Sequence, residues 1–224
     1  MQLQIINSPL TLSSSFPLFS CRVIQKAIRC LDQEGVCKLV AEFHDTVVPF
    51  VRDPNGNHVI QRSIQVISAF AKTKAKSGDP DQASGLADKM QFIVDDIVGN
   101  VLLFSSHRYG CRVVQRAIEH CVEAQRDSVL DGVVSCHERL IADQYGNYVI
   151  QQVLACGSEA HKAAVVDTLT KEKFLAKFTC HKYASNVFEA LLIHGKSANK
   201  EKVLEVMMKV RLEQNHCWVM CNRA

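Results

Sequence analysis

Apolar residues recur along the chain in a five-residue motif that returns five times. Positions 3 and 4 are apolar in every copy, and the copies are Cys21–Gln25, Asn57–Gln61, Cys111–Gln115, Asn147–Gln151 and Ser185–Glu189. Seven residues after position 1 stands another apolar residue: Ile28, Ile64, Ile118, Leu154 or Leu192. Offsets of two, three and seven place these side chains on one face of a helix. The pattern therefore predicts one amphipathic helix at each copy.

The spacing of the copies indicates a repeat protein. They begin at residues 21, 57, 111, 147 and 185, so neighbouring starts lie 36, 54, 36 and 38 residues apart. A second amphipathic stretch follows the last three copies: Val129, Leu130, Val133 and Val134; Val165, Val166 and Leu169; Val203, Leu204, Val206 and Met207. Small groups of helices bury their apolar faces only by stacking on their neighbours. An all-α fold, an α-solenoid, is predicted.

Two local features complete this organisation. A small residue precedes each copy, namely Ser20, Gly56, Gly110, Gly146 or Ala184, and it suits a tight turn into the helix. The longest interval contains the polar segment 72–89, with two glycines and one proline, which predicts a mobile inserted loop. The repeat domain is expected over residues 17–210. The flanking segments 1–16 and 211–224 match no repeat and stay unassigned.

Composition narrows the class of protein. Of 224 residues, 47% are apolar and 22% charged, which excludes wholesale disorder and fits one domain. No apolar stretch approaches the ~18 residues of a membrane span. The net charge of +3 permits a polyanionic partner without requiring one. Ten cysteines without a C-x-x-C pair are expected to be free thiols in a reducing compartment.

The remaining motif positions carry candidate binding chemistry. Position 1 is Cys, Asn or Ser, position 2 is Arg, His, Tyr or Asn, and position 5 is Gln four times and Glu once. Positions 1 and 5 share a helix face, and position 2 offers a flat group beside them. Regularly spaced flat groups with amides between them suit single-stranded nucleic acid. A polar residue on a helix is ordinarily only solvated, so the fivefold register carries this inference.

These segments resemble the recognition helices of Pumilio-type (PUF) repeats over residues 17–210. The resemblance implies a right-handed α-solenoid in which each repeat reads one base of a single-stranded RNA. Positions 1 and 5 would address the Watson–Crick edge, position 2 would stack between bases, and the RNA would run antiparallel to the protein. The triplets resemble repeats three to seven of an eight-repeat domain, so five complete repeats of a partial domain are expected.

The resemblance assigns a base to each repeat. The implied base-edge pairs are Ser185 and Glu189 for guanine, Asn147 and Gln151 for uracil, Cys111 and Gln115 for adenine, Asn57 and Gln61 for uracil, and Cys21 and Gln25 for adenine. The implied stacking residues are Asn186, Tyr148, Arg112, His58 and Arg22. The implied core is 5′-GUAUA-3′, within a UGUA-type element of mRNA 3′ untranslated regions. This implies cytoplasmic control of mRNA stability or translation.

Two other classes of function are compatible with a helical chain: a protein-interaction scaffold and an enzyme. An armadillo- or HEAT-like protein-interaction scaffold would use the same architecture, but it would not need Gln or Glu in register. Basic residues at position 6, Lys26, Arg62 and Arg116, suit phosphate contacts and solvation equally well. An enzyme is disfavoured, because Cys180-His181, His216-Cys217 and Asp95-Asp96 lack catalytic geometry. Cys217 and Cys221 lack a second metal-ligand pair. The expectation is a monomer without cofactor, metal or membrane association, with effector proteins possible on its outer surface.

Overall fold

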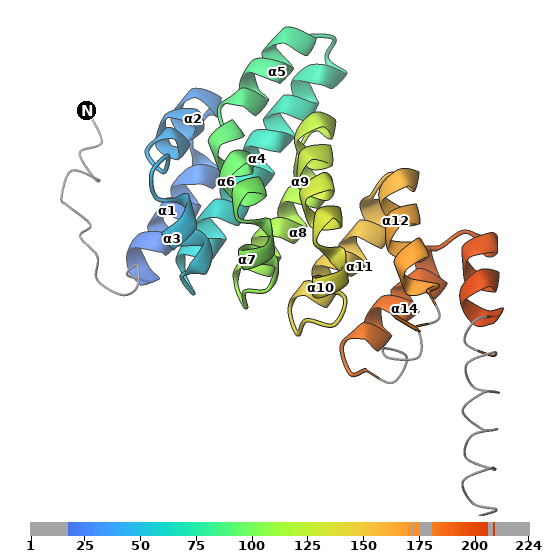
Figure 1. The fold of residues 1–224 in the computed structure, drawn as a ribbon. Helices are drawn as coiled ribbons and strands as arrows, with labels where there is room; N and C mark the ends of the chain where they lie inside the picture. The colour runs from blue at the N-terminus through green and yellow to red at the C-terminus, as the bar shows by residue number, and fades with distance from the viewer. Residues whose placement is uncertain (1–17, 172, 175–180, 206–207, 209–224) are drawn as a thin grey trace, which may run out of the picture. The chain divides into compact units, whose positions relative to one another are not determined.

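The computed structural model describes residues 18–171, 173–174, 181–205 and 208 (Figure 1). All regular elements of these residues are helices. Their bounds are α1 Leu18–Cys30, α2 Gln33–Ala41, α3 Val47–Arg52, α4 Gly56–Lys76, α5 Pro80–Asp88, α6 Gln91–Gly99, α7 Val101–Ser105, α8 Gly110–His120, α9 Glu123–Ser135, α10 His137–Leu140, α11 Gly146–Cys156, α12 Glu159–Leu169 and α14 Ala184–His194. Several sequence candidates lie outside the described residues: segments 1–16 and 211–224, Cys180, Val206, Met207, His216, Cys217 and Cys221.

The helices follow the predicted repeat. Each motif copy lies on one helix, namely α1, α4, α8, α11 or α14, which confirms five motif helices. A longer and a shorter helix separate the motif helices in two intervals: α2 and α3 between α1 and α4, and α9 and α10 between α8 and α11. Two compact units meet at Val129 and Leu130 and are described separately. In the first, α4 packs against α1, α3, α5 and α8; in the second, α11 packs against α10, α12 and α14. The described residues include no helix long and apolar enough to cross a bilayer.

The predicted apolar stripe forms the core. Positions 3 and 4 are buried in the last four repeats: Val59, Ile60, Val113, Val114, Val149, Ile150, Val187 and Phe188. The first repeat differs, because Val23 is 63% exposed whereas Ile28 is buried. The second amphipathic stretch is likewise buried at Val129, Leu130, Val165 and Leu169. Within each unit the apolar stripe therefore packs the motif helices against neighbouring helices, as its spacing predicts.

The glycines that precede three of the motifs serve a different purpose from the one expected. Gly56, Gly110 and Gly146 each begin a helix, and among the described glycines only Gly78 has a positive φ, of 83°. A Cβ on Gly110 would lie 2.7 Å from the carbonyl oxygen of Phe104. A Cβ on Gly56 would lie 2.9 Å from the corresponding oxygen of Phe50. These glycines let the start of each motif helix approach the backbone of the preceding helix closely, and they do not adopt the left-handed conformation of a tight turn.

The prediction of a loop at residues 72–89 is wrong. Helix α4 continues to Lys76, and α5 occupies Pro80–Asp88, so the insertion forms a helical hairpin at the top of Figure 1. Ala83, Leu86 and Ala87 are buried in α5, at offsets of three and four. Leu86 and Ala87 form a core cluster with Ala71 of α4. Burial of this small apolar face stabilises two helices where polar composition had suggested a mobile segment.

The hairpin's turn explains why the composition was misleading. Gly78 follows α4 in the left-handed conformation, and its N–H donates to Ala75 O at 3.2 Å. The Asp79 N–H donates to Lys74 O at 3.1 Å, which completes a Schellman-type C-cap. The Asp79 side chain then accepts from Gln82 N at 3.0 Å, and Pro80 occupies the first helical turn. The helix-breaking residues are thus confined to a single turn between two helices.

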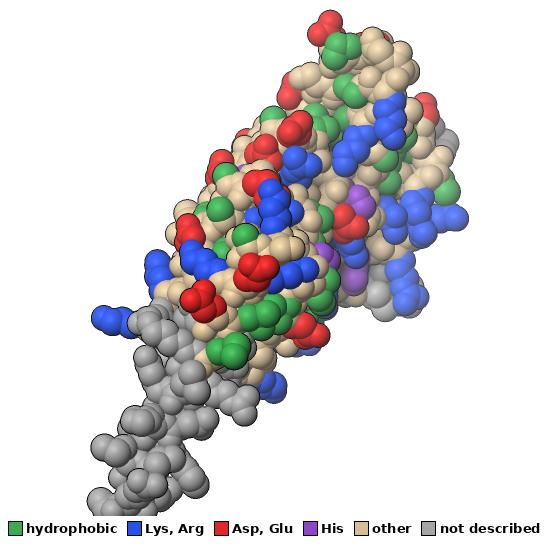
Figure 2. Space-filling view, turned by 90° about the vertical axis from the view of Figure 1, so that its right-hand side faces the viewer, with side chains coloured by type: hydrophobic (Ala, Val, Ile, Leu, Met, Phe, Trp, Pro, Cys, Tyr) green, Lys and Arg blue, Asp and Glu red, His purple; other side chains and the backbone are tan. Residues whose placement is uncertain are grey.

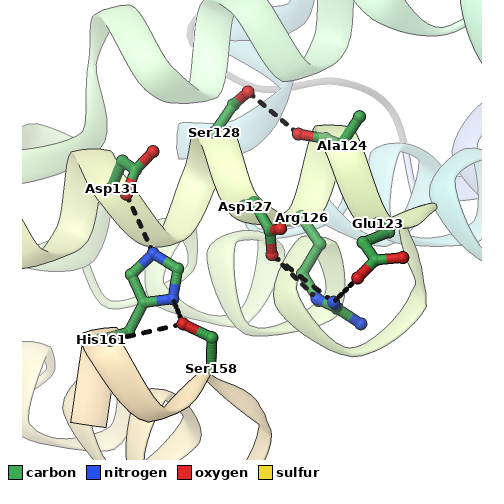
Figure 3. A network of polar contacts seen from close by, with 8 residues as sticks. All are labelled: Glu123, Ala124, Arg126, Asp127, Ser128, Asp131, Ser158 and His161. Carbon is green, nitrogen blue, oxygen red and sulfur yellow. Dashed lines mark hydrogen bonds and ion pairs between the residues drawn. The ribbon is translucent and has the colours of Figure 1, made fainter. Parts of the chain in front are cut away.

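A polar network joins successive outer helices in the second unit (Figure 3). His161 Nε2 on α12 lies 2.9 Å from Asp131 Oδ1 on α9, and its Nδ1 lies 2.7 Å from Ser158 Oγ. Ser158 is the N-cap of α12 and accepts from His161 N. Although these are the residue types of a hydrolase triad, the Ser158 hydroxyl caps the start of α12 and the Asp131 side chain is 77% exposed. The network links repeats structurally.

Candidate nucleic-acid interface

The structure places the three variable motif positions at different depths. Position 1 is buried in the first four repeats, at Cys21, Asn57, Cys111 and Asn147, and exposed at Ser185. Position 2 is exposed at Arg22, His58, Arg112 and Tyr148, and half-buried at Asn186. Position 5 is half-buried at Gln25, Gln61, Gln115 and Gln151, and exposed at Glu189. In most repeats position 1 therefore lies beneath position 5, whereas position 2 reaches solvent.

In the two Asn repeats, position 1 holds position 5 by a direct hydrogen bond. Gln61 Nε2 donates to Asn57 Oδ1 at 2.8 Å, and Gln151 Nε2 donates to Asn147 Oδ1 at 3.0 Å. The Asn57 amide donates in turn to Asp53 O at 2.8 Å and Pro54 O at 2.9 Å. Both of its N–H groups are thereby used, so the Asn orients the Gln from below. The Gln keeps its carbonyl oxygen and one N–H for a ligand.

In the third repeat, Cys at position 1 removes this support. Cys111 Sγ contacts Arg108 O at 3.7 Å and offers no amide oxygen to Gln115. Among the described residues, Gln115 Nε2 is buried without a hydrogen-bond partner. Its Oε1 accepts from Arg112 Nη1 at 3.2 Å. The Cys repeat therefore leaves the Gln115 amide N–H without a partner, and the Cys side chain is smaller than Asn.

Burial keeps the first-repeat thiol neutral. The pKa of Cys21 is raised to about 11, chiefly by burial and secondly by the negative charge of Asp53. A neutral thiol is a small, weakly polar group. Cys21 therefore acts beneath Gln25 as a space-setting residue, and it is unsuited to be a nucleophile at neutral pH.

The last repeat carries a different acceptor. Glu189 is exposed on α14, and Ser185 Oγ donates to Lys182 O at 3.1 Å. An ionised carboxylate only accepts hydrogen bonds, so this repeat suits a ligand edge with two donors. Asn186 Nδ2 donates to Asn147 Oδ1 at 3.3 Å, from the neighbouring repeat. Position 2 of the fifth repeat thus lies against position 1 of the fourth repeat.

Residues that position each motif helix were missed by the sequence reasoning. Asp53 Oδ1 accepts from the N–H groups of Asn55 and Gly56, at 2.8 and 2.7 Å. Asp143 Oδ1 makes the equivalent bonds to Tyr145 and Gly146, at 2.8 and 2.7 Å. Each stands four residues before position 1. That offset is Asp, His, Asp and His in the last four repeats, which is the signal that would have identified them.

Histidine caps the helix in the other two repeats. His107 Nδ1 accepts from Tyr109 N and Gly110 N, both at 3.3 Å. His181 Nδ1 accepts from Tyr183 N at 3.3 Å and Ala184 N at 3.4 Å. Only an unprotonated Nδ1 can accept these bonds. Burial, followed by the charges of Arg52 and Arg108, lowers the pKa of His107 and favours the neutral cap.

The surface charge is mixed. On the face shown in Figure 2, basic and acidic side chains alternate over the left part, whereas Lys and Arg predominate along the right-hand edge. This matches a chain of 26 basic and 23 acidic residues. Any affinity for a polyanion must therefore depend on local groups of basic residues, because the net charge is small.

A family model described as Pumilio-family RNA binding repeat matches residues 18–44, 47–71, 100–134, 139–170 and 175–208. The unmatched interval 72–99 contains the end of α4, α5 and α6. The Schizosaccharomyces pombe Pumilio domain-containing protein C6G9.14 is 30% identical over 92% of this chain and 27% of its own length. Suppressor protein MPT5 of Saccharomyces cerevisiae is 31% identical over 78% of this chain and 19% of its own length.

Solved structures agree with the sequence relatives. The crystal structure of PUF-8 in complex with PBE-RNA matches with a TM-score of 0.73 and 31% identity, covering 86% of this chain and 51% of that one. The Puf3 RNA binding domain bound to a Cox17 RNA 3′ UTR recognition sequence matches with a TM-score of 0.71 and 32% identity, covering 86% and 50%. The chain thus spans about half of these domains. The fold is an α-solenoid of Pumilio-type repeats, which is the fold of RNA-binding PUF proteins. The chain belongs to the Pumilio (PUF) family.

Proposed function

We propose that this chain binds single-stranded RNA in a sequence-specific way, with one base per repeat and a core of 5′-GUAUA-3′. The core would lie in a UGUA-type element of an mRNA 3′ untranslated region. Binding would control the stability or translation of that mRNA in the cytoplasm, and the chain would act as a monomer without a cofactor or catalytic activity. Effector proteins would bind the outer surface.

One observation carries this proposal: in the two Asn repeats, the second and the fourth, the residue at position 1 holds the position-5 side chain by the same hydrogen bond. The Gln61–Asn57 and Gln151–Asn147 bonds repeat the same geometry in two repeats. A solvated surface amide has no reason to be fixed twice in the same way. A fixed amide loses less conformational entropy when it binds a ligand, which favours specific recognition.

The chemistry of the supported Gln fits uracil. Its carbonyl oxygen can accept from the uracil ring N–H while its remaining N–H donates to a uracil carbonyl. Adenine offers the opposite arrangement, a ring nitrogen acceptor beside an amino donor, and has a larger edge. The smaller Cys111 leaves room for that edge, and the unpartnered Gln115 N–H supplies a donor to it. Guanine presents two adjacent donors, which match the carboxylate of Glu189.

The relatives support RNA as the ligand. The PUF-8 and Puf3 structures contain RNA, and the Puf3 ligand is a 3′ UTR recognition sequence. Both are more than 30% identical to this chain over most of its length. The exposed position-2 side chains, such as Tyr148 and Arg112, are suited to stack on bases.

The test is fluorescence-anisotropy binding of labelled 5′-UGUAUA-3′ at fixed salt, because phosphate contacts make affinity salt-dependent. The wild-type chain should prefer this RNA to one in which G is replaced by U. Ser185→Asn/Glu189→Gln should reverse that preference, because it installs the Asn–Gln pair. Gln151→Ala should weaken binding, whereas the neighbouring control Gln152→Ala should not. Equal, weak binding of every RNA by the folded protein would contradict the proposal and favour a protein-interaction scaffold.

A further inference from the structure

The first two motif helices carry basic residues on the same face as the position-2 side chains. These residues, called here the basic stripe, are Arg22, Lys26 and Arg29 on α1 and Arg62, Lys72 and Lys76 on α4. A helix turns by about 100° per residue, so offsets of 4, 14 and 18 from His58 all fall within about 40° of its direction. Lys26 and Arg29, at offsets of 4 and 7 from Arg22, likewise lie within about 40° of the direction of Arg22. The basic stripe therefore begins at the position-2 side chains Arg22 and His58 and continues along each helix.

The helices that carry the basic stripe contribute no counter-charge of their own. Neither α1 nor α4 contains an Asp or Glu. Within the described part of the chain, no stripe residue lies within 4.0 Å of a carboxylate. Outer lysines behave differently: Lys171 pairs with Glu138, and Lys202 with Asp167. Unpaired like charges on adjacent packed helices raise the local potential and attract an anionic ligand.

The insertion extends this charge beyond the repeat. Helix α4 has 21 residues, whereas α8, α11 and α14 each have 11. Lys72 and Lys76 lie on this extension, both exposed, and Lys76 stands about 27 Å along the helix from His58 at 1.5 Å per residue. The packing of Leu86 and Ala87 against Ala71 holds the extension in place. The backbone positions of Lys72 and Lys76 are therefore fixed relative to His58 on the same helix.

We propose that the basic stripe binds the phosphate backbone of RNA nucleotides lying 3′ of the base-read core, with Lys72 and Lys76 as its distal contacts. This inference rests on the proposed function. An antiparallel RNA places its last read base at α1, so the 3′ flank begins at α1 and would turn along the helix axis to reach the extension of α4, which packs against α1. Continuity of the stripe with Arg22 and His58 favours RNA over an acidic protein segment, which would not need to begin at the stacking residues.

The experiment compares three labelled RNAs: the core 5′-UGUAUA-3′ alone, the core with a 3′ cytidine tract, and the core with a 5′ cytidine tract of equal length. Each is titrated with the wild-type chain, with Lys72→Gln/Lys76→Gln, and with the control Lys38→Gln/Lys89→Gln. The control removes the same charge from exposed residues outside the stripe. Salt dependence is measured for each pair, and circular dichroism verifies that every variant is folded.

The 3′ tract should tighten wild-type binding by about 5-fold per phosphate contact near 0.1 M salt, since each contact adds about 0.7 to the logarithmic salt slope. The Lys72→Gln/Lys76→Gln variant should lose this gain and about 1.4 of the slope, whereas the control should keep both. No gain from the 3′ tract, an equal gain from the 5′ tract, or an equal loss in the control would overturn the inference. Base preference on the core alone tests the proposed function separately. If that preference is absent, both proposals fail.

Discussion

The side chain of Gln61 donates a hydrogen bond to Asn57 Oδ1 at 2.8 Å, one helical turn away. The Asn is buried and fully used by backbone carbonyls, so it acts by orienting the Gln. The same relationship recurs between Gln151 and Asn147, whereas the Cys repeat lacks it. The identity of position 1 therefore decides how position 5 is presented to a ligand.

Changing position 1 should change the preferred base. Asn147→Cys is expected to shift the preference at the third base of 5′-UGUAUA-3′ from uracil to adenine, because the smaller thiol frees the Gln151 N–H and makes room for a purine. Loss or gain of one or two hydrogen bonds corresponds to about tenfold in affinity. Anisotropy titrations with 5′-UGUAUA-3′ and 5′-UGAAUA-3′ measure the shift.

Asn57→Cys is the matched control for this change. It should alter the preference at the fifth base and leave the third base unaffected. A preference for uracil that persists at the third base in Asn147→Cys would show that position 1 does not govern selection.

The histidine cap predicts a pH-dependent contribution to stability. The pKa of His107 is lowered in the folded chain, so below the ordinary value of 6.5 the unfolded chain binds more protons. The stabilisation is fully present above pH 6.5 and is lost as pH falls through the folded-state pKa. His107→Asp should weaken this dependence, because an Asp cap like Asp53 accepts both N–H groups down to lower pH.

Urea unfolding at pH 7.5 and 5.5 measures this difference. The fall in free energy of unfolding between the two pH values should be smaller in His107→Asp than in the wild-type chain. His120, whose pKa is also lowered by burial, contributes equally to both proteins and cancels in the comparison. An identical fall in the two proteins would exclude a neutral His107 cap.

The helix-start glycines should not tolerate a methyl group. Gly110→Ala places a Cβ 2.7 Å from Phe104 O and 2.9 Å from Phe104 Cα, both backbone atoms that cannot rotate away. Overpacking of this kind costs about 1–3 kcal/mol in free energy of unfolding. Gly85→Ala is the control, because its Cβ meets nothing within 4 Å inside α5, and it should stabilise by up to about 1 kcal/mol. Chemical denaturation of both variants gives the comparison, and equal effects would refute the close-approach explanation.

The helical hairpin of α4 and α5 should contribute to the free energy of unfolding through its buried core. Leu86 is 6% exposed and belongs to the cluster with Ala71 and Ala87, so Leu86→Ala should lower the free energy of unfolding by about 2–5 kcal/mol. The exposed neighbour Ser84→Ala should change it little. Amide hydrogen exchange should show protection within α5. Free exchange there, together with a neutral Leu86→Ala, would restore the loop interpretation.

The sequence alone was sufficient for the features that depend on local periodicity. Offsets of two, three and seven identified the helices around Val59, Val113 and Val149, because a helix must bury its apolar face. The register of Gln and Glu placed position 5 once on each motif helix, because every motif copy forms one helix. Neither conclusion requires knowledge of what lies on the other side of the helix.

Tertiary structure decided what depends on neighbours in space. Gly110 proved to be a contact glycine because Phe104 O lies against its Cα, which no local pattern reveals. Segment 72–89 proved helical because a few small apolar residues found a partner in Ala71, although its composition is that of a loop. Asn57 proved to be a support for Gln61 because its depth is set by packing. Local sequence determines which helices form and which face is apolar, whereas burial and close approach arise only when the helices pack together.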